Sequence, residues 1–483
     1  MSVPEERVAG DLPVVDAATA AGEVPDDATL VTSGFGSVGY PKAVPAALAR
    51  SGRDLSLTVV SGGSAGEEID VDLVEAGAVE RRIPYQAERP ARDAINDGEI
   101  AFHDRHIAAL GDDVAYGGLV DADVAVVEAV AVGEDWFVPA MSIGPVPAFV
   151  RAADRLIVEV NDVPPLELAR LHDVLRRSPP PDREPIPLSG PGERAADAKV
   201  RFDSDKLAAV VRTSQSDKAY SFRDPTEDDR AIAANLGEFL ASEAERNPLL
   251  AHRVTLQFGV GSLGNALMGE LSGIDFGTRE VVYFGELIQD GLVEMVDEGA
   301  LEIASATAMA VTPECQQRVF DNVERYAERM VLRPSYVSNA AETIDRFGVV
   351  GVNSALEVDV YGNANSTHVN GTHLLNGIGG SGDFNRNSPL AITALPSTAK
   401  GGEISRVVPM VPHADHSEHD IDVIITEQGV ADLRGLAPRE RADLLVEECA
   451  HPEVRPDLRA YLERAEEGGG HVPHDLETAF DWR

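Results

Sequence analysis

Apolar runs rich in strand-forming residues alternate along the chain with stretches of helical spacing and with glycine-rich turns. Four of these runs are nearly continuous in apolar residues: 123–130, 155–160, 280–287 and 422–429. Such runs are typical of strands that are buried on both faces of a parallel sheet. The pattern therefore predicts an α/β fold built on parallel sheets.

Two of the runs resemble each other. Residues 123–128 read DVAVVE and residues 422–427 read DVIITE, so each starts with Asp, continues in apolar residues and ends in Glu. The match is short, and a chance similarity remains the alternative. It suggests a weak internal duplication.

The length of 483 residues predicts two or three domains, since one domain usually holds roughly 100–200 residues. The proline-rich stretch 176–192 is predicted to be a loop, and KLAAVVRT at 206–213 is predicted to be a strand after it. We therefore place the domain boundary near residue 220, which gives an N-terminal domain 1–220 and a C-terminal domain 221–483.

A helix is predicted to begin just after this boundary. Pro225 and Thr226 precede apolar residues at helical spacing, namely Ile232, Leu236, Phe239 and Leu240. Acidic residues follow Thr226 directly, where they favour the positive end of the helix dipole.

The chain is strongly acidic, with 82 Asp and Glu residues against 41 Lys and Arg residues and a net charge of −41. This charge repels nucleic acid phosphates and anionic membranes, so we expect neither as a partner. The acidic residues are spread along the chain, and lysine occurs only at positions 42, 199, 206, 218 and 400. The pattern is typical of proteins adapted to concentrated salt, where a Debye length of about 3 Å at 1 M screens self-repulsion; a partner that prefers acidic surfaces is the alternative.

No apolar run approaches the roughly 20 residues that span a bilayer, and MSVPEERVAG lacks the features of a signal peptide. We therefore expect a cytoplasmic protein. The two cysteines, Cys315 and Cys449, fit neither a disulfide framework nor a metal-binding spacing, and we expect buried thiols.

Three glycine-associated segments carry candidate chemistry. LQFGVGSLGNAL at 256–267 has the form of a strand, a glycine-rich turn and a helix start, where backbone amides bind anionic groups. Glu286 follows a predicted strand directly, at the edge where α/β folds bind their ligands. NGIGGSGDFNRNS at 376–388 crowds four glycines into six positions, which suits backbone N–H groups aimed at an oxyanion. The structural alternatives are a tight turn, an exposed strand-end glutamate and a glycine-lined bend, respectively.

Two further segments carry charge or possible metal ligands. Lys400 in PSTAKGG is the only lysine of the C-terminal half, and it favours an anionic ligand over a purely solvated role. HADHSEHD supplies His413, Asp415, His416, His419 and Asp420 as candidate metal ligands, which would make the protein a hydrolase. The segment lies between predicted strands without a helical HExxH pattern, so a loop without metal is the favoured interpretation.

Taken together, these segments resemble the acetyl-CoA hydrolase/transferase family, and within it the succinyl-CoA:acetate CoA-transferases. The resemblance extends from SGFGSVGYPKAVPAAL at 33–48, through the dense stretch 354–388, to TEQGVADLRGL at 426–436. It implies two related parallel-sheet domains of the NagB/RpiA-like type, with the active site in the cleft between them. It also implies acyl-CoA and small carboxylates as substrates, a homodimer, and no metal or cofactor other than CoA itself.

The resemblance also implies roles for particular residues. The nucleophilic glutamate falls on Glu286, and the oxyanion hole falls on the Asn339 side chain and the Gly380 amide. Arg223 is a weaker candidate for holding the substrate carboxylate. The expected CoA-binding residues are Gly261, Ser262, Leu263, Gly264, Asn265, Leu356, Asn376, Gly380 and Lys400.

One position departs from the family pattern. Relatives usually carry Thr or Ser before the glutamate, whereas this chain has Gly285. A local hydrogen bond to the carboxylate is therefore expected to be missing.

The expected reaction passes through an acyl-glutamyl anhydride and a glutamyl-CoA thioester on Glu286. Three alternatives stay open at this point: an acyl-CoA hydrolase that uses the same glutamate, a non-catalytic CoA-binding protein, and a metal hydrolase that uses the histidine segment.

Overall fold

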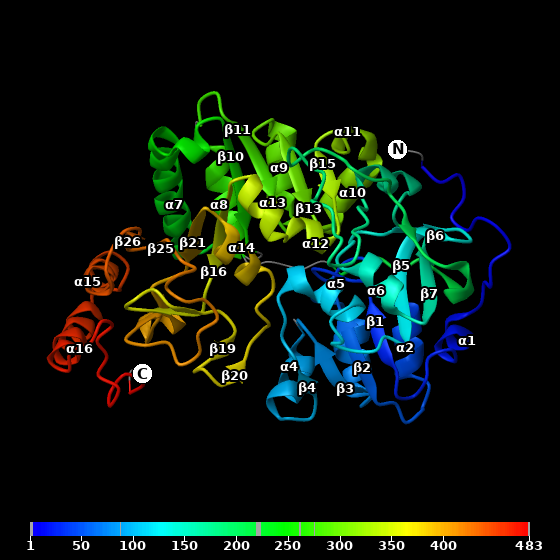
Figure 1. The fold of residues 1–483 in the computed structure, drawn as a ribbon, viewed down its shortest axis with the longest axis horizontal. Helices are drawn as coiled ribbons and strands as arrows, with labels where there is room; N and C mark the ends of the chain where they lie inside the picture. The colour runs from blue at the N-terminus through cyan, green and yellow to red at the C-terminus, as the bar shows by residue number, and fades with distance from the viewer. Residues whose placement is uncertain (1–2, 87, 219–223, 260–261, 275, 482–483) are drawn as a thin grey trace. The chain divides into compact units, whose positions relative to one another are not determined.

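The computed structural model describes residues 3–86, 88–218, 224–259, 262–274 and 276–481 (Figure 1). The chain forms two compact units. Unit 1 comprises Met1–Ser221, Tyr283–Asp297 and Glu302–Thr343, and unit 2 comprises Phe222–Val282, Glu298–Leu301 and Ile344–Arg483. The units are interleaved in the sequence after residue 221, and the two-domain division at residue 220 stays a prediction.

Unit 1 contains a nine-stranded sheet whose central strands are all parallel. Its parallel strands follow the order β4-β3-β2-β1-β5-β7-β9, while β6 pairs antiparallel with β5 and with β8. The strands are β1 (Thr29–Thr32), β2 (Leu57–Ser61), β3 (Val79–Ile83), β4 (Ala101–Phe102), β5 (Val124–Val132), β6 (Trp136–Pro139), β7 (Arg155–Asn161), β8 (Val200–Arg201) and β9 (Leu207–Thr213).

Helices connect these strands, as a parallel sheet requires. They are α1 (Ala17–Ala21), α2 (Ala43–Ala49), α3 (Leu73–Glu75), α4 (Arg89–Asn96), α5 (Ile107–Ala115) and α6 (Val146–Ala152), with shorter turns at Glu68–Asp72, Leu166–Leu171 and Ser204–Lys206. One apolar core packs side chains of β1, β2 and β5 against α1, α2 and α3. The predicted α/β class with parallel sheets is confirmed.

The later segments of unit 1 form short strands and helices. They are β12 (Leu287–Ile288), β13 (Ile303–Ala306), β14 (Ala308–Met309), α10 (Pro313–Asp321), α11 (Val323–Tyr326), β15 (Met330–Leu332) and α12 (Ser335–Ser338). Strand β12 pairs parallel with β14, and β13 pairs parallel with β15. Three elements span points where the chain passes between the units: β11 (Glu280–Phe284), α9 (Asp290–Glu298) and α13 (Ala341–Arg346).

Unit 2 contains the parallel strand order β10-β16-β21-β25, and β26 pairs antiparallel at its end. Its larger strands are β10 (Arg253–Phe258), β16 (Val349–Ser354), β21 (Leu390–Ala394), β25 (Val423–Thr426) and β26 (Gly429–Asp432). Its short strands are β17 (Glu357–Asp359), β18 (Ala364–Asn365), β19 (His368–Val369), β20 (His373–Leu374), β22 (Thr398–Ala399), β23 (Ile404–Ser405) and β24 (Val407–Val408).

The helices of unit 2 are α7 (Glu227–Arg246), α8 (Ser262–Ser272), α14 (Ser381–Asn387), α15 (Pro438–Glu448) and α16 (Arg455–Glu467), with short turns at Pro248–Leu250 and Lys400–Gly402. Helices α7 and α8 pack against each other, and α7 also contacts β25 and β26 (Figure 1). A second apolar core packs α15 against β25 and β26.

Helix α7 begins where the sequence predicts it. Thr226 is its N-cap, and Thr226 and Asp229 form a reciprocal capping box. The predicted apolar face, Ile232, Leu236, Phe239 and Leu240, is buried. Satisfying two free N–H groups at the helix start fixes this boundary.

The four predicted strands at 123–130, 155–160, 280–287 and 422–429 are present as β5, β7, β11 and β25. The predicted strand at 206–213 is β9, and the proline-rich stretch 176–192 contains no regular element. Strand β5 is buried along its whole length, as its continuous apolar run predicts. Both cysteines are free and buried.

The similar sequences 123–128 and 422–427 occupy similar structural positions. Asp123 precedes β5, and one of its carboxylate oxygens accepts a hydrogen bond from the Thr29 N–H of the parallel neighbour β1 at 2.7 Å. Asp422 precedes β25, and its carboxylate accepts from the Ala391 N–H of the parallel neighbour β21 at 2.9 Å. An antiparallel strand then follows each, β6 or β26. This repeated arrangement agrees with an internal duplication.

Candidate active site

Glu286 lies in the turn that follows β11. The strand is buried at its end, and the carboxylate residue after it is partly exposed. The backbone around it is fixed on both sides: the Gly285 N–H donates to the Ser305 carbonyl at 2.9 Å, and the Glu286 carbonyl accepts from Thr307 and Ala308 at 2.9 and 3.1 Å. The position of the Glu286 Cα is therefore set by backbone hydrogen bonds to the segment 305–308.

Asn339 brings an amide to the Glu286 carboxylate. Its Nδ2 donates to Glu286 Oε1 at 2.8 Å, although 53 residues separate the two along the chain. Asn339 follows α12 directly and is fully buried. The structure thus brings together the two side chains that the sequence places at the catalytic centre.

Ser338 determines which way the Asn339 amide faces. The Ser338 hydroxyl donates to Asn339 Oδ1 at 2.7 Å. Because the amide oxygen accepts this bond, the amide nitrogen is the atom directed toward Glu286. The sequence analysis missed Ser338, which carries no motif of its own.

Arg333 anchors the segment that leads into α12. Its guanidinium is fully buried, forms an ion pair with Asp173, and donates to Ser305 Oγ and to the Pro191 carbonyl, both at 2.9 Å. Burial lowers the pKa of Arg333 to about 10, and the neighbouring Asp173 carboxylate opposes this shift. The Arg333 carbonyl also accepts from Thr307 Oγ1 at 2.7 Å, so the segments carrying Asn339 and supporting Glu286 are tied together.

Gly36, in the glycine-rich segment 33–39, packs directly on the residue after the glutamate. It has a left-handed φ of +68°, and a Cβ at this position would lie 2.6 Å from Leu287 Cδ2. Only glycine combines this backbone conformation with so close a contact. Leu287 is buried, and the contact restricts how far the Glu286 turn can shift.

A buried ionic cluster holds the end of this same segment. Lys42 Nζ lies 2.5 Å from Glu128 Oε2 and 2.8 Å from Asp217 Oδ1. Glu159 accepts backbone hydrogen bonds at the start of α2, including one from the Lys42 N–H at 2.8 Å. Burial raises the pKa of Glu128 against the opposing charge of Lys42, and the nearby carboxylates add to the increase.

Gly285, the position where the resemblance leads us to expect a Thr or Ser, is buried and offers no side-chain donor. The Asn339 amide supplies a hydrogen bond to the carboxylate next to it. The expected loss of a local donor at Gly285 therefore leaves the carboxylate with a donor from α12.

The expected CoA-binding turn lies at the start of α8 in unit 2. Gly264 needs to be glycine, since a Cβ there would lie 2.6 Å from the Gly259 carbonyl oxygen. Leu263 is partly exposed. Gly261 and the side chains of Ser262 and Asn265 lie outside the described part of the structure, as does Arg223.

Gly380 is the N-cap residue of α14, and it is buried. Within the described residues, nothing accepts a hydrogen bond from its N–H group. An unpaired N–H at a helix start is suited to a developing negative charge. The predicted glycine-rich segment is thus a short helix start with a donor available.

Asn376 and Leu356 are joined through a neighbouring loop. The Asn376 amide donates to the Gly377 carbonyl at 2.9 Å and, over 3.4 Å, to the Ser366 carbonyl. The Leu356 N–H donates to the Asn365 carbonyl at 2.7 Å. Both expected CoA contacts therefore border residues 365–366.

Lys400 lies in a short connection of unit 2. It is exposed, with a left-handed φ of 50°, in the connection between β22 and β23. Among the described residues it forms no ion pair. Its ammonium is therefore available to an anionic ligand, and its contribution to the site stays a prediction.

Three buried amides form a network that no sequence motif indicates. Gln257 Nε2 donates to Asn353 Oδ1 at 3.1 Å, and Asn353 Nδ2 donates to Asn385 Oδ1 at 2.8 Å. These residues belong to β10, β16 and α14, so the network links the strand before the CoA-binding turn with the helix that Gly380 starts. Buried amides keep such positions only when they are paired.

Glu427 in the TEQG segment is also held firmly. It accepts hydrogen bonds from the Ser397 N–H at 2.7 Å, from the Ser397 hydroxyl and from Gln428 Nε2 at 2.9 Å. Burial raises the pKa of this carboxyl, but the hydrogen bonds from Ser397 and Gln428 outweigh burial and lower it. Glu427 is therefore ionised at neutral pH.

The histidine segment does not form a single cluster. The His413 ring packs on the His368 ring at 4.2 Å and lies 3.2 Å from Asp415, whereas buried His416 contacts Ser381 Oγ at 3.1 Å. The side chain of His419 is 83% exposed. In the described ranges, no group of three or more His, Cys, Asp or Glu residues is placed to hold a metal ion. His416 instead supports the start of α14 beside Gly380.

Solved structures share this fold. RipA from Yersinia pestis matches with a TM-score of 0.71 and 21% identity, over 94% of this chain and 97% of that one. A 4-hydroxybutyrate CoA-transferase from Porphyromonas gingivalis matches with a TM-score of 0.62 and 20% identity over the same shares. The chain thus has the same fold as these two solved structures.

The sequence comparisons identify the family. The models of the acetyl-CoA hydrolase/transferase N-terminal and C-terminal domains match residues 13–178 and 315–462. The chain is 41% identical to a succinyl-CoA:acetate CoA-transferase from Clostridium kluyveri over 97% of its length and 88% of the relative. The protein belongs to the acetyl-CoA hydrolase/transferase family, as the sequence resemblance implies.

Other relatives carry different names. A propanoyl-CoA:succinate CoA transferase from Escherichia coli is 40% identical over 93% of this chain and 92% of the relative. An acetyl-CoA hydrolase from Eremothecium gossypii is also 40% identical, over 93% of this chain and 89% of the relative. Two relatives with the same 40% identity to this chain are therefore named for different reactions, one for CoA transfer and one for hydrolysis.

Across the described residues, no helix combines the length and the apolar character needed to cross a membrane.

Proposed function

We propose that the protein is a CoA-transferase that moves CoA between an acyl-CoA, such as succinyl-CoA or acetyl-CoA, and a free carboxylate such as acetate. The observation that carries the proposal is the 2.8 Å hydrogen bond between Asn339 and Glu286, in a chain that is 41% identical to a succinyl-CoA:acetate CoA-transferase. This hydrogen bond places an amide N–H donor directly beside the carboxylate at the end of β11.

In the proposed reaction, a Glu286 carboxylate oxygen attacks the thioester carbonyl, and the C–S bond breaks to release CoA thiolate. The thiolate then attacks the Glu286 carbonyl of the resulting anhydride, and the first carboxylate leaves. An incoming carboxylate attacks the glutamyl-CoA thioester and reverses both steps. The thioester bond energy is conserved, so the exchange needs no ATP.

Each step forms a tetrahedral oxyanion that needs donors. We assign this role to Asn339 Nδ2 and to the N–H of Gly380. Each such donor contributes about 3 kcal/mol to lowering the barrier in comparable acyl transfers. Remote binding energy from the CoA nucleotide and pantetheine helps to close the site against water, which would hydrolyse the anhydride.

The finer assignments follow from the family resemblance. We propose an N-terminal domain 1–220 and a C-terminal domain 221–483 with the active site in the cleft between them, a homodimeric assembly, and a location in the cytoplasm. CoA is proposed to contact Gly261, Ser262, Leu263, Gly264, Asn265, Leu356, Asn376, Gly380 and Lys400.

Acyl-CoA hydrolysis is the second candidate, and it is favoured by the relatives that are named acetyl-CoA hydrolases. Water would then attack the same intermediates. Two products are measured after incubation with succinyl-CoA, with and without acetate: free thiol and acetyl-CoA. Their ratio distinguishes transfer from hydrolysis. Transfer predicts acetyl-CoA formation that exceeds free thiol release; thiol release that is indifferent to acetate would contradict it.

Glu286→Ala tests the covalent role. We expect it to lower kcat by a factor on the order of 10⁴ or more, because the nucleophile is removed. Glu294→Gln, an exposed change on α9 that leaves the site intact, is the matched control and should keep full activity.

Borohydride reduction after incubation with acyl-CoA gives an independent readout. Reduction of a glutamyl-CoA thioester converts the Glu286 side chain to an alcohol, which mass spectrometry detects in the peptide containing it. An unchanged peptide from active wild-type protein would rule out the thioester. A protein that binds CoA but shows neither turnover nor trapping would be the non-catalytic CoA-binding protein.

A further inference from the structure

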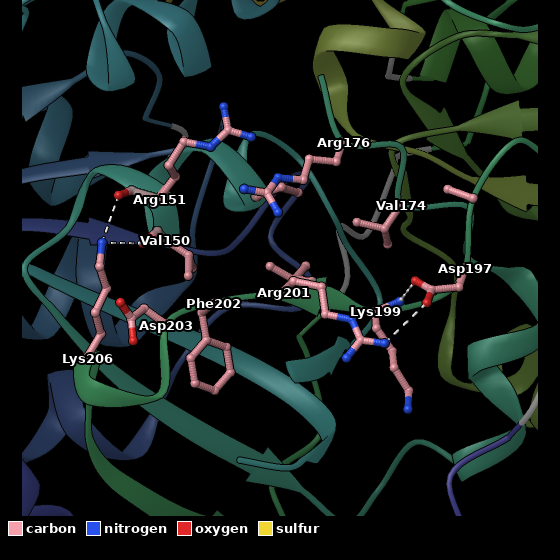
Figure 2. Close-up of a pocket in the computed structure, with 13 residues that line it drawn as sticks. Val150, Arg151, Val174, Arg176, Asp197, Lys199, Arg201, Phe202, Asp203 and Lys206 are labelled. Carbon is pink, nitrogen blue, oxygen red and sulfur yellow. Dashed lines mark hydrogen bonds and ion pairs between the residues drawn. The ribbon is translucent and has the colours of Figure 1, made fainter. Parts of the chain in front are cut away.

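A hollow of about 660 Å³ lies within unit 1. Its lining comes from the end of α6, from residues 174–176 and from residues 196–206 (Figure 2). Its size falls in the range of small-molecule sites. None of the proposed catalytic or CoA-binding residues lines it.

The lining is cationic in a chain that is strongly acidic. Five side chains carry positive charge, Arg151, Arg176, Lys199, Arg201 and Lys206, while the carboxylates that line the hollow are Asp197 and Asp203. The chain as a whole has twice as many acidic as basic residues. Two of its five lysines lie here, so the hollow reverses the charge of the surrounding protein.

Most of this positive charge is not neutralised. Arg201 forms long ion pairs with Asp135 and Asp197, at 3.4 and 3.6 Å. In the part of the chain that the structure describes, the other four cations form no ion pair. An anion entering the hollow would therefore meet charge that no carboxylate already occupies.

Several of the cations are held in place by neutral groups. Lys206 Nζ donates to the carbonyls of Arg151 and Ala153 at 2.8 and 2.7 Å, where α6 ends. Lys199 Nζ lies 3.7 Å from the centre of the Trp136 ring, and the Arg151 guanidinium contacts the Tyr116 hydroxyl. Cations that are already ordered lose less conformational entropy when a ligand binds.

Arg176 is the most open of these cations to an incoming ligand, because no hydrogen bond or ion pair of its side chain is found among the described residues. It is exposed, and Figure 2 shows its guanidinium directed over the hollow, on the side opposite Phe202. Guanidinium groups bind phosphate oxygens bidentately, which suits a ligand with several such oxygens.

The hollow also has an apolar side. Pro147, Val150, Val174 and Phe202 line it beside the cations. An inorganic ion would leave this surface in water, whereas an organic phosphate would cover it. The combination favours a ligand with both a phosphate chain and an apolar or aromatic part.

We propose that this hollow binds a phosphate-bearing organic anion of the nucleoside triphosphate type, at a site separate from the acyl-CoA site. The bound anion neutralises the unpaired cations and covers the apolar side. The proposal does not depend on the transferase assignment, because binding is measured without turnover.

Isothermal titration calorimetry with ATP tests the proposal. It is run with the CoA-saturated protein, at the lowest salt concentration that preserves its circular dichroism spectrum. We expect saturable binding of ATP with one site per chain. Inorganic pyrophosphate and adenosine are titrated in parallel, and ATP should bind at least threefold more tightly than either. Equal affinities for ATP and pyrophosphate would overturn the proposal that the hollow binds an organic anion.

Variants locate the binding. Arg176→Ala and Lys199→Ala should each weaken ATP binding about tenfold, since each removes a charge-assisted contact. Arg212→Ala is the control, because Arg212 is an exposed arginine on β9 outside the lining, and its affinity should stay within twofold of wild type. Equally weakened ATP binding in all three variants would indicate a nonspecific effect of net charge, and it would overturn the proposed site.

Two further outcomes would also overturn the proposal. One is an absence of ATP binding to folded protein. The other is ATP binding that occurs only without CoA, which would place ATP in the CoA site.

Discussion

The Glu286 carboxylate owes its position to groups that are distant in the sequence. Its backbone is fixed by the segment 305–308, and its side chain by Asn339. Gly285 offers no hydroxyl beside the carboxylate, whereas the Asn339 amide donates to it. Mutation of Ser338 can therefore test the orientation of the Asn339 amide.

Ser338→Ala is expected to lower kcat about tenfold while leaving the KM for acyl-CoA nearly unchanged. Without the Ser338 hydroxyl, the Asn339 amide can rotate and present its oxygen to the Glu286 carboxylate, which repels it. Steady-state kinetics of the purified variant measure this split.

Ser338→Thr keeps the hydroxyl and should restore most of the activity, with thermal unfolding checked for both variants. A purely structural role would lower stability in Ser338→Ala without separating kcat from KM. Wild-type kcat in Ser338→Ala would contradict the proposed orientation.

The sequence predicted only part of the site. Glu286 follows an apolar run, so its position at the end of a strand was predictable from the sequence. Asn339 and Gly380 were predicted from the family resemblance. Ser338 and the Gln257, Asn353 and Asn385 network were not predicted, because their hydrogen bonds join elements far apart in the chain. Such pairings depend on tertiary packing, which leaves no local periodicity.

At the scale of elements, the long buried strands and α7 were predicted correctly. Continuous apolar runs and a capping box are strong local signals. Two-residue strands such as β19 and β20 were not predicted, because two residues are too few to show an alternation. Their pairing is set by the loops around residues 365–376.

Helix α7 carries a pH-dependent contact at its end. Glu243 Oε1 lies 2.8 Å from Arg434 Nη2, and Glu243 also pairs with Arg246 and Asn247. Hydrogen bonds from Arg434, followed by those from Asn247 and Arg246, lower the pKa of Glu243 to about 2 against the effect of burial. The ionised form is thus favoured in the folded protein.

Glu243→Gln is therefore expected to lower the free energy of unfolding by about 2 kcal/mol at pH 7. Because the folded pKa is below that of the unfolded chain, this stabilisation is complete above about pH 5 and is lost as the pH falls toward 2. Urea unfolding at several pH values measures the difference from wild type. Glu238→Gln, exposed on the same helix, is the control; a difference that does not shrink in acid would contradict the role of Glu243.

The Lys42 cluster stabilises the connection between β1 and α2. Lys42→Met is expected to destabilise the protein by about 3 kcal/mol, because Glu128 and Asp217 would remain buried without their cation. Chemical denaturation of the variant measures this loss. Lys42→Met combined with Glu128→Gln should recover part of it, and additive losses in the double variant would show that the two residues are not coupled.

At the scale of the whole molecule, the most prominent property is the large negative net charge. A net charge of −41 makes the folded chain repel itself in dilute buffer. Burial of the two cores opposes this repulsion, and salt reduces it. We therefore propose that the protein is adapted to concentrated salt.

The temperature of unfolding is expected to rise steeply as KCl increases from about 0.1 M to 1 M, over which the Debye length falls from about 10 Å to 3 Å. Thermal unfolding followed by circular dichroism measures this. Sucrose at matched osmolality controls for exclusion effects and should stabilise much less. Maximal stability in dilute buffer would contradict salt adaptation.

The interleaving of the two units has a consequence during synthesis. Unit 1 begins at the N-terminus but includes Glu302–Thr343, so its last strands and α12 reach it only after unit 2 has begun to emerge. At roughly 5–20 residues per second, a ribosome needs on the order of ten seconds to make the intervening segment. For that interval the nascent N-terminal half lacks both Glu286 and Asn339. A fragment ending near residue 220 would lack the segments Tyr283–Asp297 and Glu302–Thr343 that complete unit 1.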